Sequence, residues 1–181
     1  LMESGVRMLL NDMKRALDRG VQIRILTGNY LGITQPSALY LIKSELGDRV
    51  DLRLYNETSR SFHPKSYIFH YADHSEIYIG SSNISRSALT SGIEWNYRFS
   101  SHRDPENYEK FYRTFEDLFQ NHSIVIDDKE LKRYSKSWHR PAASKDLDRY
   151  DNVEEEENTK VRLLFEPRGA QIEALCALEN S

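Results

Sequence analysis

The sequence contains a single cysteine, Cys176, among 181 residues, and it has no hydrophobic run long enough to cross a membrane. One cysteine excludes an internal disulfide framework and a zinc site built from cysteine ligands. It also favours a reducing, cytoplasmic setting. Because no spanning run and no secretory leader are visible, we expect no membrane partner.

An excess of basic charge is also missing. Lysine and arginine total 25 against 28 acidic residues, which gives a net charge of −3. Residues 1–140 carry 20 basic and 18 acidic side chains, whereas residues 141–181 carry 5 and 10. This balance excludes nucleic-acid binding through charge spread over the whole surface. Any phosphate must be bound by a local cluster.

Hydrophobic residues make up 39% of the chain and aromatic residues 11%, enough for one globular core. Apolar residues at helical spacing up to Gly20, then an alternating segment 21–28, a helix 35–46 and a strand 50–55, indicate a β-α-β arrangement. We therefore expect an α/β fold with a mixed, mainly parallel sheet flanked by helices on both faces. The remaining expected strands are 65–70, 76–79 and 94–100, and the remaining expected helices are 85–90, 105–119 and 128–138.

The helix over 105–119 carries a stripe of aromatic residues, which we expect to lie in the core. The composition changes after Trp138. We expect one domain over residues 1–139 and an acidic linker over 140–160, which includes the run Glu154–Glu157. Apolar character returns over 161–181, as at the beginning of a further, truncated domain.

The strongest chemical signal is His63-Pro64-Lys65 followed by Gly80-Ser81-Ser82-Asn83. On a strand, residues two apart face the same side, so His63 and Lys65 can present an imidazole and a fixed cation together. An imidazole can act as nucleophile or acid/base, and a cation can hold a phosphate. The glycine-containing turn can return small side chains and backbone N–H groups to the same place. These groups suit phosphodiester chemistry and need no metal.

This pattern resembles the motif of the phospholipase D superfamily, which pairs His-x-Lys with a downstream Gly-Ser-x-Asn. The resemblance covers about residues 1–120 and implies a phospholipase D-like fold. The superfamily places an aspartate after four further residues, where this chain has His70, and Asp73 lies three residues later. That departure resembles the metal-independent DNA-cutting subgroup, of nuclease and restriction type.

The resemblance implies His63, Lys65, Asn83 and Glu94 as catalytic residues. His63 would attack phosphorus and form a phosphohistidine, Lys65 and Asn83 would hold the non-bridging oxygens, and Glu94 would orient His63. Ser81 and Ser82 would add phosphate contacts. No metal or other cofactor is expected for this domain.

The chemistry uses two motifs and the chain has one, so we expect a homodimer with one shared active site. A second imidazole from the partner would protonate the leaving oxygen and then activate water. DNA is the expected substrate and partner. Three arginines near the motif strands are candidates for contacts to the DNA backbone, with solvated surface positions as the alternative: Arg60, Arg86 and Arg98.

The segment Phe165–Leu175 resembles the region before the nucleotide-binding loop of superfamily two helicases and restriction-enzyme motor subunits, including type III restriction-like proteins. In such proteins a glutamine placed like Gln171 reads adenine. The resemblance implies that the domain belongs to a longer helicase or restriction protein, whose missing portion would use ATP and Mg²⁺.

Three alternatives remain. The same fold can serve as a catalytically inactive DNA- or phosphate-binding module, which the missing aspartate favours. A lipid phosphodiesterase is disfavoured, because no amphipathic segment faces a membrane. A zinc site from His63, His70, His74 and Asp73 is disfavoured by the alternation of side chains along strands.

Overall fold

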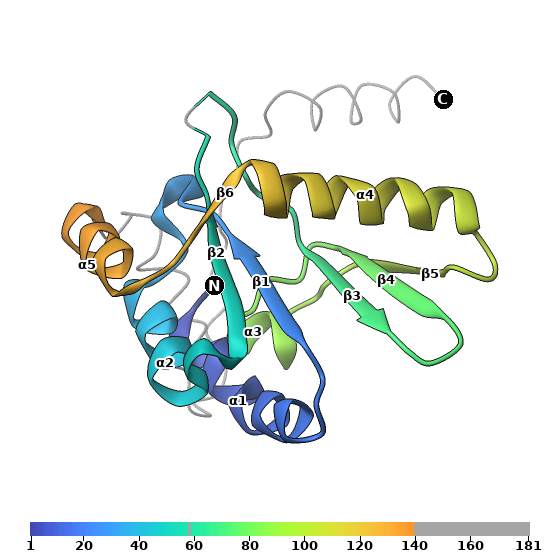
Figure 1. The fold of residues 1–181 in the computed structure, drawn as a ribbon, viewed down its shortest axis with the longest axis horizontal. Helices are drawn as coiled ribbons and strands as arrows, with labels where there is room; N and C mark the ends of the chain where they lie inside the picture. Colours follow the sequence, from blue (N-terminus) through green and yellow to red (C-terminus); the bar gives the residue numbers. More distant parts are fainter. Residues whose placement is uncertain (58, 140–181) are drawn as a thin grey trace, which may run out of the picture.

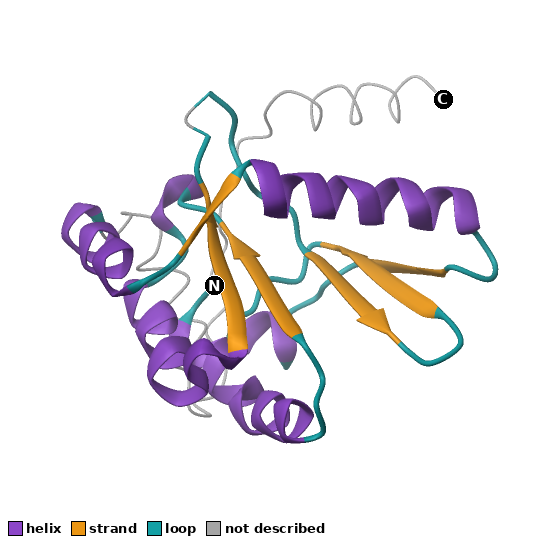
Figure 2. Ribbon diagram, viewed as in Figure 1, coloured by secondary structure: helices purple, strands orange, loops and turns teal. Residues whose placement is uncertain are grey.

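The computed structural model describes residues 1–57 and 59–139. Two three-stranded sheets and one long helix that reaches both organise this part of the chain (Figures 1 and 2). The helices and strands, in chain order, are α1 (Glu3–Asp18), β1 (Ile23–Thr27), a 3₁₀ turn (Tyr30–Gly32), α2 (Pro36–Leu46), a second 3₁₀ turn (Gly47–Arg49), β2 (Val50–Tyr55), β3 (Ser66–His70), β4 (Ser75–Gly80), α3 (Arg86–Leu89), β5 (Asn96–Ser100), α4 (Pro105–Asn121), β6 (Ser123–Val125) and α5 (Asp128–Ser137).

The first sheet has the strand order β1-β2-β6 and contains the predicted β-α-β unit. Strands β1 and β2 are parallel, with Ile23 opposite Val50 and Thr27 opposite Leu54. Strand β6, which the sequence pattern did not predict, pairs antiparallel with β2. At three residues, β6 is too short to show a readable alternation of apolar and polar side chains.

The second sheet has the order β3-β4-β5 and is entirely antiparallel. The expectation of a mainly parallel sheet is therefore wrong, since β1–β2 is the one parallel pair in the part of the chain that the structure describes. The physical reason is the short link between β3 and β4. Four residues allow a hairpin, whereas a parallel crossover needs a dozen or more.

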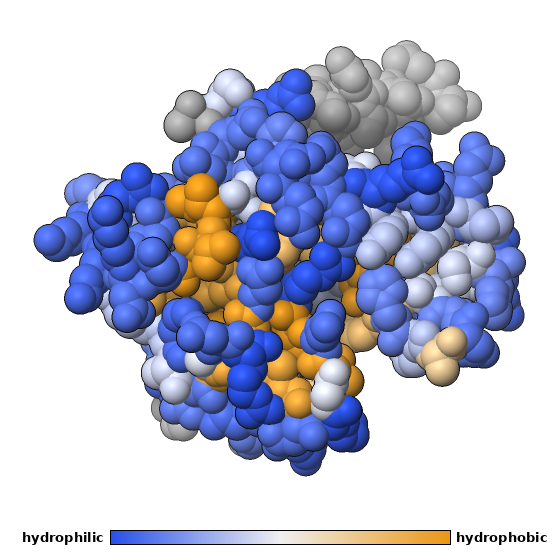
Figure 3. Space-filling view, in the orientation of Figure 1, coloured by the Kyte–Doolittle hydropathy of each residue, from blue (hydrophilic) through white to orange (hydrophobic). Residues whose placement is uncertain are grey.

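The main core lies on one face of the first sheet, where α1, α2 and α5 cover it. Its members are apolar side chains at most 9% exposed: Val6, Leu17, Ala38, Leu39, Ile42, Leu46, Val50, Leu52, Leu54, Ile126, Leu131 and Tyr134. Strand β2 supplies alternate residues to this core, in the period-two pattern of a sheet covered by helices. Figure 3 shows apolar side chains gathering over β6 and over the lower ends of β1 and β2, within a mostly hydrophilic surface.

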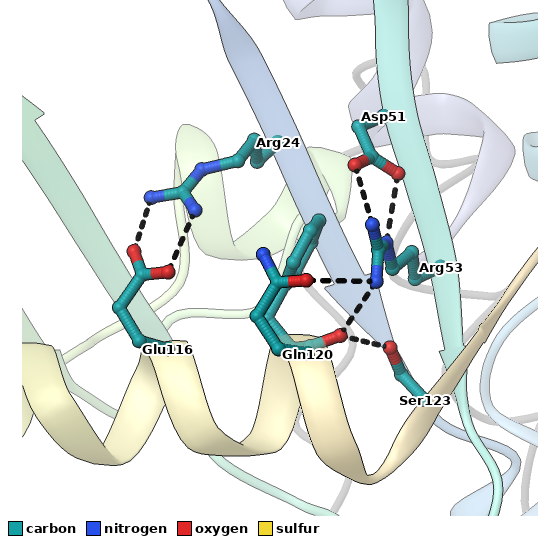
Figure 4. Close-up of polar contacts among 7 residues, drawn as sticks. Arg24, Asp51, Arg53, Glu116, Gln120 and Ser123 are labelled. Atoms are coloured by element: carbon teal, nitrogen blue, oxygen red, sulfur yellow. Dashed lines mark hydrogen bonds and ion pairs between the residues drawn. The ribbon is translucent and has the colours of Figure 1, made fainter.

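Helix α4 covers the other face of the first sheet through arginines (Figure 4). Arg24 on β1 makes two hydrogen bonds to Glu116, of 3.0 and 2.6 Å, and its guanidinium lies over the ring of Phe119. Arg53 on β2 donates to the Phe119 carbonyl at 3.0 Å and is held by both carboxylate oxygens of Asp51. Helices thus flank both faces of this sheet, as expected.

The aromatic stripe of α4 is less buried than the sequence pattern suggested. Phe119 is fully buried, whereas Phe111 is 43% exposed while packing on Phe99 of β5. Helix α4 contacts β2, β5 and β6, so it bridges two small sheets instead of resting on one broad one. Its aromatic side chains therefore stay partly open to solvent. No helix in residues 1–57 and 59–139 is long and apolar enough to span a membrane.

Candidate active site

His63 lies at the point where the chain leaves the first sheet and enters the second. Phe62, just before it, stacks on Tyr55 at the end of β2, with ring centroids 4.9 Å apart. The same phenyl group packs over Gly28, where an added Cβ would lie 2.9 Å from a ring carbon. This close approach anchors Phe62 and presents the exposed His63 beside the carboxyl ends of β1 and β2. Ligands commonly bind at such strand ends in α/β folds.

Lys65 and His63, the two charged or ionisable residues of the His-x-Lys motif, are in direct contact. The ammonium nitrogen of Lys65 lies 2.9 Å from both Nδ1 and Nε2 of the imidazole, and 3.3 Å from the His63 carbonyl oxygen. A neutral imidazole has one nitrogen with a free lone pair, so Lys65 can donate to one ring nitrogen at a time. The contact therefore requires that His63 be neutral.

The electrostatic surroundings favour that neutral form. Partial loss of contact with water lowers the pKa of His63 although its side chain stays exposed, and the positive charge of Lys65 lowers that pKa further. Burial also lowers the pKa of Lys65, an effect that the nearby Glu94 carboxylate opposes. An unprotonated imidazole is the form that can attack phosphorus.

The Gly80–Asn83 turn is held tightly between β3 and the segment before β5. The Gly80 N–H donates to the Lys65 carbonyl at 3.1 Å, and the Ser81 N–H donates to the Trp95 carbonyl at 3.0 Å. A Cβ on Gly80 would lie 2.0 Å from the Trp95 carbonyl oxygen, so no other residue fits there without moving backbone. Helix α1 also packs on the segment after the turn, since a Cβ on Gly5 would lie 2.4 Å from backbone atoms of Ile84 and Ser85.

The two serines of the turn already have partners within the protein. Ser81 Oγ donates to the carboxylate of Glu94 and accepts from the Trp95 N–H at 3.0 Å. Ser82 is buried, and its Oγ lies 2.7 Å from the side-chain nitrogen of Asn96. In this structure the Ser82 hydroxyl thus binds Asn96, a partner that would compete with the predicted phosphate and that the sequence did not reveal.

Asn83 differs from the serines. Its backbone carbonyl accepts from Ser85, while among the described residues its side-chain amide has no hydrogen bond. Asn83 is therefore the motif residue whose side-chain donor groups remain available for a substrate phosphate, whereas Lys65 would exchange its contacts with His63 for one.

Glu94 does not reach His63 with a hydrogen bond in the described part of the chain. Its carboxylate instead accepts from Ser81, and its charge influences Lys65 and Tyr67. Burial raises the pKa of Tyr67, with Glu94 adding to the effect, while the Tyr67 hydroxyl donates to the Ser82 carbonyl at 2.9 Å. Glu94 therefore supports the turn and the lysine in this arrangement.

His70, in the position where an aspartate was expected, has a role within the second sheet. Its Nδ1 lies 2.9 Å from Ser75 Oγ, across the β3–β4 pair, and its ring packs edge-on against Tyr112 of α4. His74 pairs with Asp73 at 2.8 Å. The histidines of the hairpin are thus engaged separately, and no cluster able to hold a metal ion occurs within the described ranges.

The candidate arginines do not form one group. Arg98 lies on β5, 3.8 Å from the Glu76 carboxylate on the neighbouring strand. Arg60 and Arg86 are exposed, Arg60 three residues before His63 and Arg86 at the start of α3 after the turn. Arg60 and Arg86 therefore remain the stronger candidates for phosphate contacts near the site. Gln171 and the acidic linker lie outside the described residues.

Tyr30 is a neighbour of His63 that the sequence reasoning missed. Its ring centroid lies 4.9 Å from that of the imidazole, with a tilt of 53° between the planes. The sequence did contain a signal for this placement, because Tyr30 lies three residues after the end of β1, the first strand of the β-α-β unit. Residues there gather at the mouth of the sheet.

One family of known proteins is similar to most of this chain. No curated protein matches the chain. The family described as "Cardiolipin synthase, PLD-like domain" matches residues 4–122, a segment that runs from α1 to the end of α4 and includes His63, Lys65 and the Gly80–Asn83 turn. The chain therefore belongs to the PLD-like domain family.

Proposed function

We propose that this domain is a metal-independent phosphodiesterase that cleaves DNA through a phosphohistidine intermediate. Its family supports phosphodiester chemistry in general. The observation that carries the proposal is the contact of 2.9 Å between Lys65 and a His63 whose pKa is lowered, beside the Gly80–Asn83 turn. A neutral imidazole and an adjacent cation are what an in-line attack on a phosphate diester needs.

In the first step a His63 nitrogen forms a bond to phosphorus while the bond from phosphorus to the leaving oxygen breaks. Lys65 and the Asn83 amide stabilise the non-bridging oxygens as negative charge develops. A second imidazole gives its proton to the leaving oxygen. In the second step that imidazole takes a proton from water, the hydroxide attacks phosphorus, and His63 is released.

The second imidazole is proposed to come from a second copy of the chain across a two-fold axis. The surface beside the site supports this arrangement. Ile93, Trp95 and Tyr97, which flank Glu94, are 92%, 82% and 68% exposed, and large apolar groups next to one another commonly mark an interface. A homodimer that buries them would bring the two motifs together.

Attachment to a helicase or restriction motor is proposed on the resemblance of residues 165–175 to such proteins. Under that proposal ATP and Mg²⁺ serve the motor and take no part in the nuclease step.

The alternative is a DNA- or phosphate-binding module of the same fold without turnover. It is favoured by His70 in the place of the motif aspartate and by the engagement of Glu94 with Ser81 instead of His63. Such a module would retain Lys65 and Asn83 as its phosphate contacts.

A plasmid-nicking assay in EDTA separates the two functions. We expect the wild-type protein to convert supercoiled plasmid to nicked and linear forms, and His63→Ala to abolish conversion. His102→Ala, a change at an exposed histidine in the turn after β5, serves as the control. Plasmid binding without nicking, equal for wild type and His63→Ala, would favour the binding module. Turnover of anionic vesicles without DNA cleavage would overturn both.

A further inference from the structure

The loop that follows β1 has an unusual backbone and two exposed apolar side chains. Leu31 has φ of 52°, a left-handed conformation that leucine rarely adopts, and Gly32 follows with φ of 64°. Leu31 is 64% exposed and Tyr30 is 37% exposed. Such a conformation persists where the surrounding structure enforces it, and it is concentrated at functional sites.

Several hydrogen bonds, two of them buried, hold this loop in place. Thr27 and Thr34, at its two ends, are both buried and share a hydrogen bond of 2.8 Å between their hydroxyl groups. The Tyr134 hydroxyl donates to the Thr34 carbonyl at 2.8 Å and lies 3.2 Å from the side-chain oxygen of Asn29. Trp138 donates its indole N–H to the Gly32 carbonyl at 2.7 Å.

Tyr134 lies on α5 and Trp138 directly follows that helix, whereas the family match ends at residue 122. The loop beside His63 is therefore held by an element outside the segment that matches the family. Burial raises the pKa of Tyr134, so its hydroxyl stays protonated as a donor. A rigid support of this kind keeps the Tyr30 ring in one place.

The position of that ring suggests what it does. Tyr30 lies against the His63 imidazole, with 4.9 Å between ring centroids, and it keeps more than a third of its surface open. A group bonded to the phosphate that His63 attacks would come within reach of the tyrosine. Nucleic-acid bases stack on such exposed aromatic faces irrespective of sequence.

We infer that Tyr30 is a substrate-contacting residue on which a base next to the scissile phosphate stacks, and that α5 positions it through Tyr134 and Trp138. This inference rests on the proposed function, since it assigns the substrate class of the same site. The exposed Leu31 extends the apolar surface beside Tyr30. A lipid headgroup, which has no planar ring, would gain no stacking energy there.

Two oligonucleotides of equal length and charge test the inference. One carries thymine at every position, and the other consists of abasic tetrahydrofuran residues. We expect Tyr30→Leu to lower kcat/KM about tenfold on the first, in line with the usual strength of base stacking, and to leave the second nearly unchanged. Tyr30→Phe keeps the ring and should behave like wild type on both.

A direct reading of stacking comes from 2-aminopurine, whose fluorescence falls when it stacks on an aromatic ring. On mixing an oligonucleotide that contains 2-aminopurine with protein, we expect quenching by wild type and Tyr30→Phe, and its loss in Tyr30→Leu. An equal loss of kcat/KM on both oligonucleotides, or no loss on either, would overturn the inference and leave the proposed nuclease intact. Failure of the wild-type protein to bind or cleave either oligonucleotide would overturn the proposed function, and the inference with it.

Discussion

The ammonium nitrogen of Lys65 lies 2.9 Å from both ring nitrogens of His63. Because burial and this cation both lower the pKa of the imidazole, His63 is mainly neutral at pH 7, and protonation occurs below its ordinary pKa. We therefore expect the acid limb of the cleavage profile to fall below that ordinary pKa. An acid limb at or above the ordinary pKa would contradict the prediction.

Replacement of the cation should move that pKa upward. In Lys65→Met the Coulombic effect of Lys65 is removed while burial and the effect of the amino-terminal charge remain, so we expect the pKa of His63 to rise part of the way to its ordinary value. An NMR titration of the His63 ring protons measures it without any need for activity. Lys110→Met, on the exposed side of α4, is the control and should leave the titration unchanged.

The two serines of the turn should respond differently to alanine. Ser82→Ala removes the hydrogen bonds between the buried Ser82 hydroxyl and the side chain of the exposed Asn96, and we expect a cost of about 0.5–1.5 kcal/mol in the free energy of unfolding. Ser81→Ala, at an exposed site, should cost less stability and should lower cleavage by freeing Glu94. Urea unfolding and the nicking assay measure the two effects. A Ser82→Ala protein with unchanged stability would refute the structural role assigned here.

The Arg24–Glu116 pair should make stability depend on acid pH. The Arg24 hydrogen bond is the largest cause of the lowered pKa of Glu116, so its stabilising contribution is complete above the unfolded pKa. That contribution is lost as the pH falls through the lower, folded-state pKa. We expect Glu116→Gln to cost about 0.5–1 kcal/mol at pH 7 and to flatten stability between pH 5 and 3.

Urea unfolding at several pH values measures this, with Glu109→Gln as the matched control on the same helix. Glu109 pairs with Arg113, whose side chain is 78% exposed, and its loss should matter little. Equal effects of the two substitutions at pH 7 would count against a special contribution from Arg24.

The proposed dimer predicts a strong effect at Trp95. Its side chain is 82% exposed, whereas its backbone N–H and carbonyl hold Ser81, so Trp95→Glu can change the surface without disturbing the turn. We expect the variant to sediment as a monomer and to lose nicking activity. Tyr71→Glu, at an exposed site in the β3–β4 turn, should leave both properties unchanged. An active, dimeric Trp95→Glu protein would exclude this interface.

The support of Tyr30 by α5 predicts coupling between distant positions. Trp138→Phe keeps a ring but removes the indole N–H that donates to the Gly32 carbonyl. This loss should lower the preference for the thymine oligonucleotide over the abasic one by about threefold, because an ordinary hydrogen bond contributes about 0.5–1.5 kcal/mol. In the Tyr30→Leu background the same change should have no further effect on this preference. Additive effects of the two substitutions on this preference would show that Trp138 acts independently of Tyr30 and would contradict the prediction.

Much of the fold could be predicted from local patterns. The β-α-β unit, the hairpin of the motif strand and the helices over 105–119 and 128–138 follow from periodicity and turn residues, and the structure places them within a few residues of their expected bounds. Strand β6 could not be predicted, because it exists through pairing with Arg53–Tyr55 of β2. The division into two sheets was missed for a similar reason, since the alternation of apolar and polar residues along a strand does not show which other strand it pairs with.

The candidate site was predictable in its residue types and less so in its contacts. His63 and Lys65 meet because two positions on one extended segment share a face. The engagement of Glu94 with Ser81, and of Ser82 with Asn96, depends on how the turn docks against the segment before β5. No spacing rule predicts which side chain pairs with each serine hydroxyl.

The sequence alone determined that this chain carries a phospholipase D-like motif, since residue identity and spacing along a strand are local properties. Tertiary structure alone decided that Tyr30 lies beside His63 and that Trp138 and Tyr134 hold its loop. Those contacts join residues 33 to 106 positions apart, and they form because the main core packs α5 against α2 at the mouth of the first sheet.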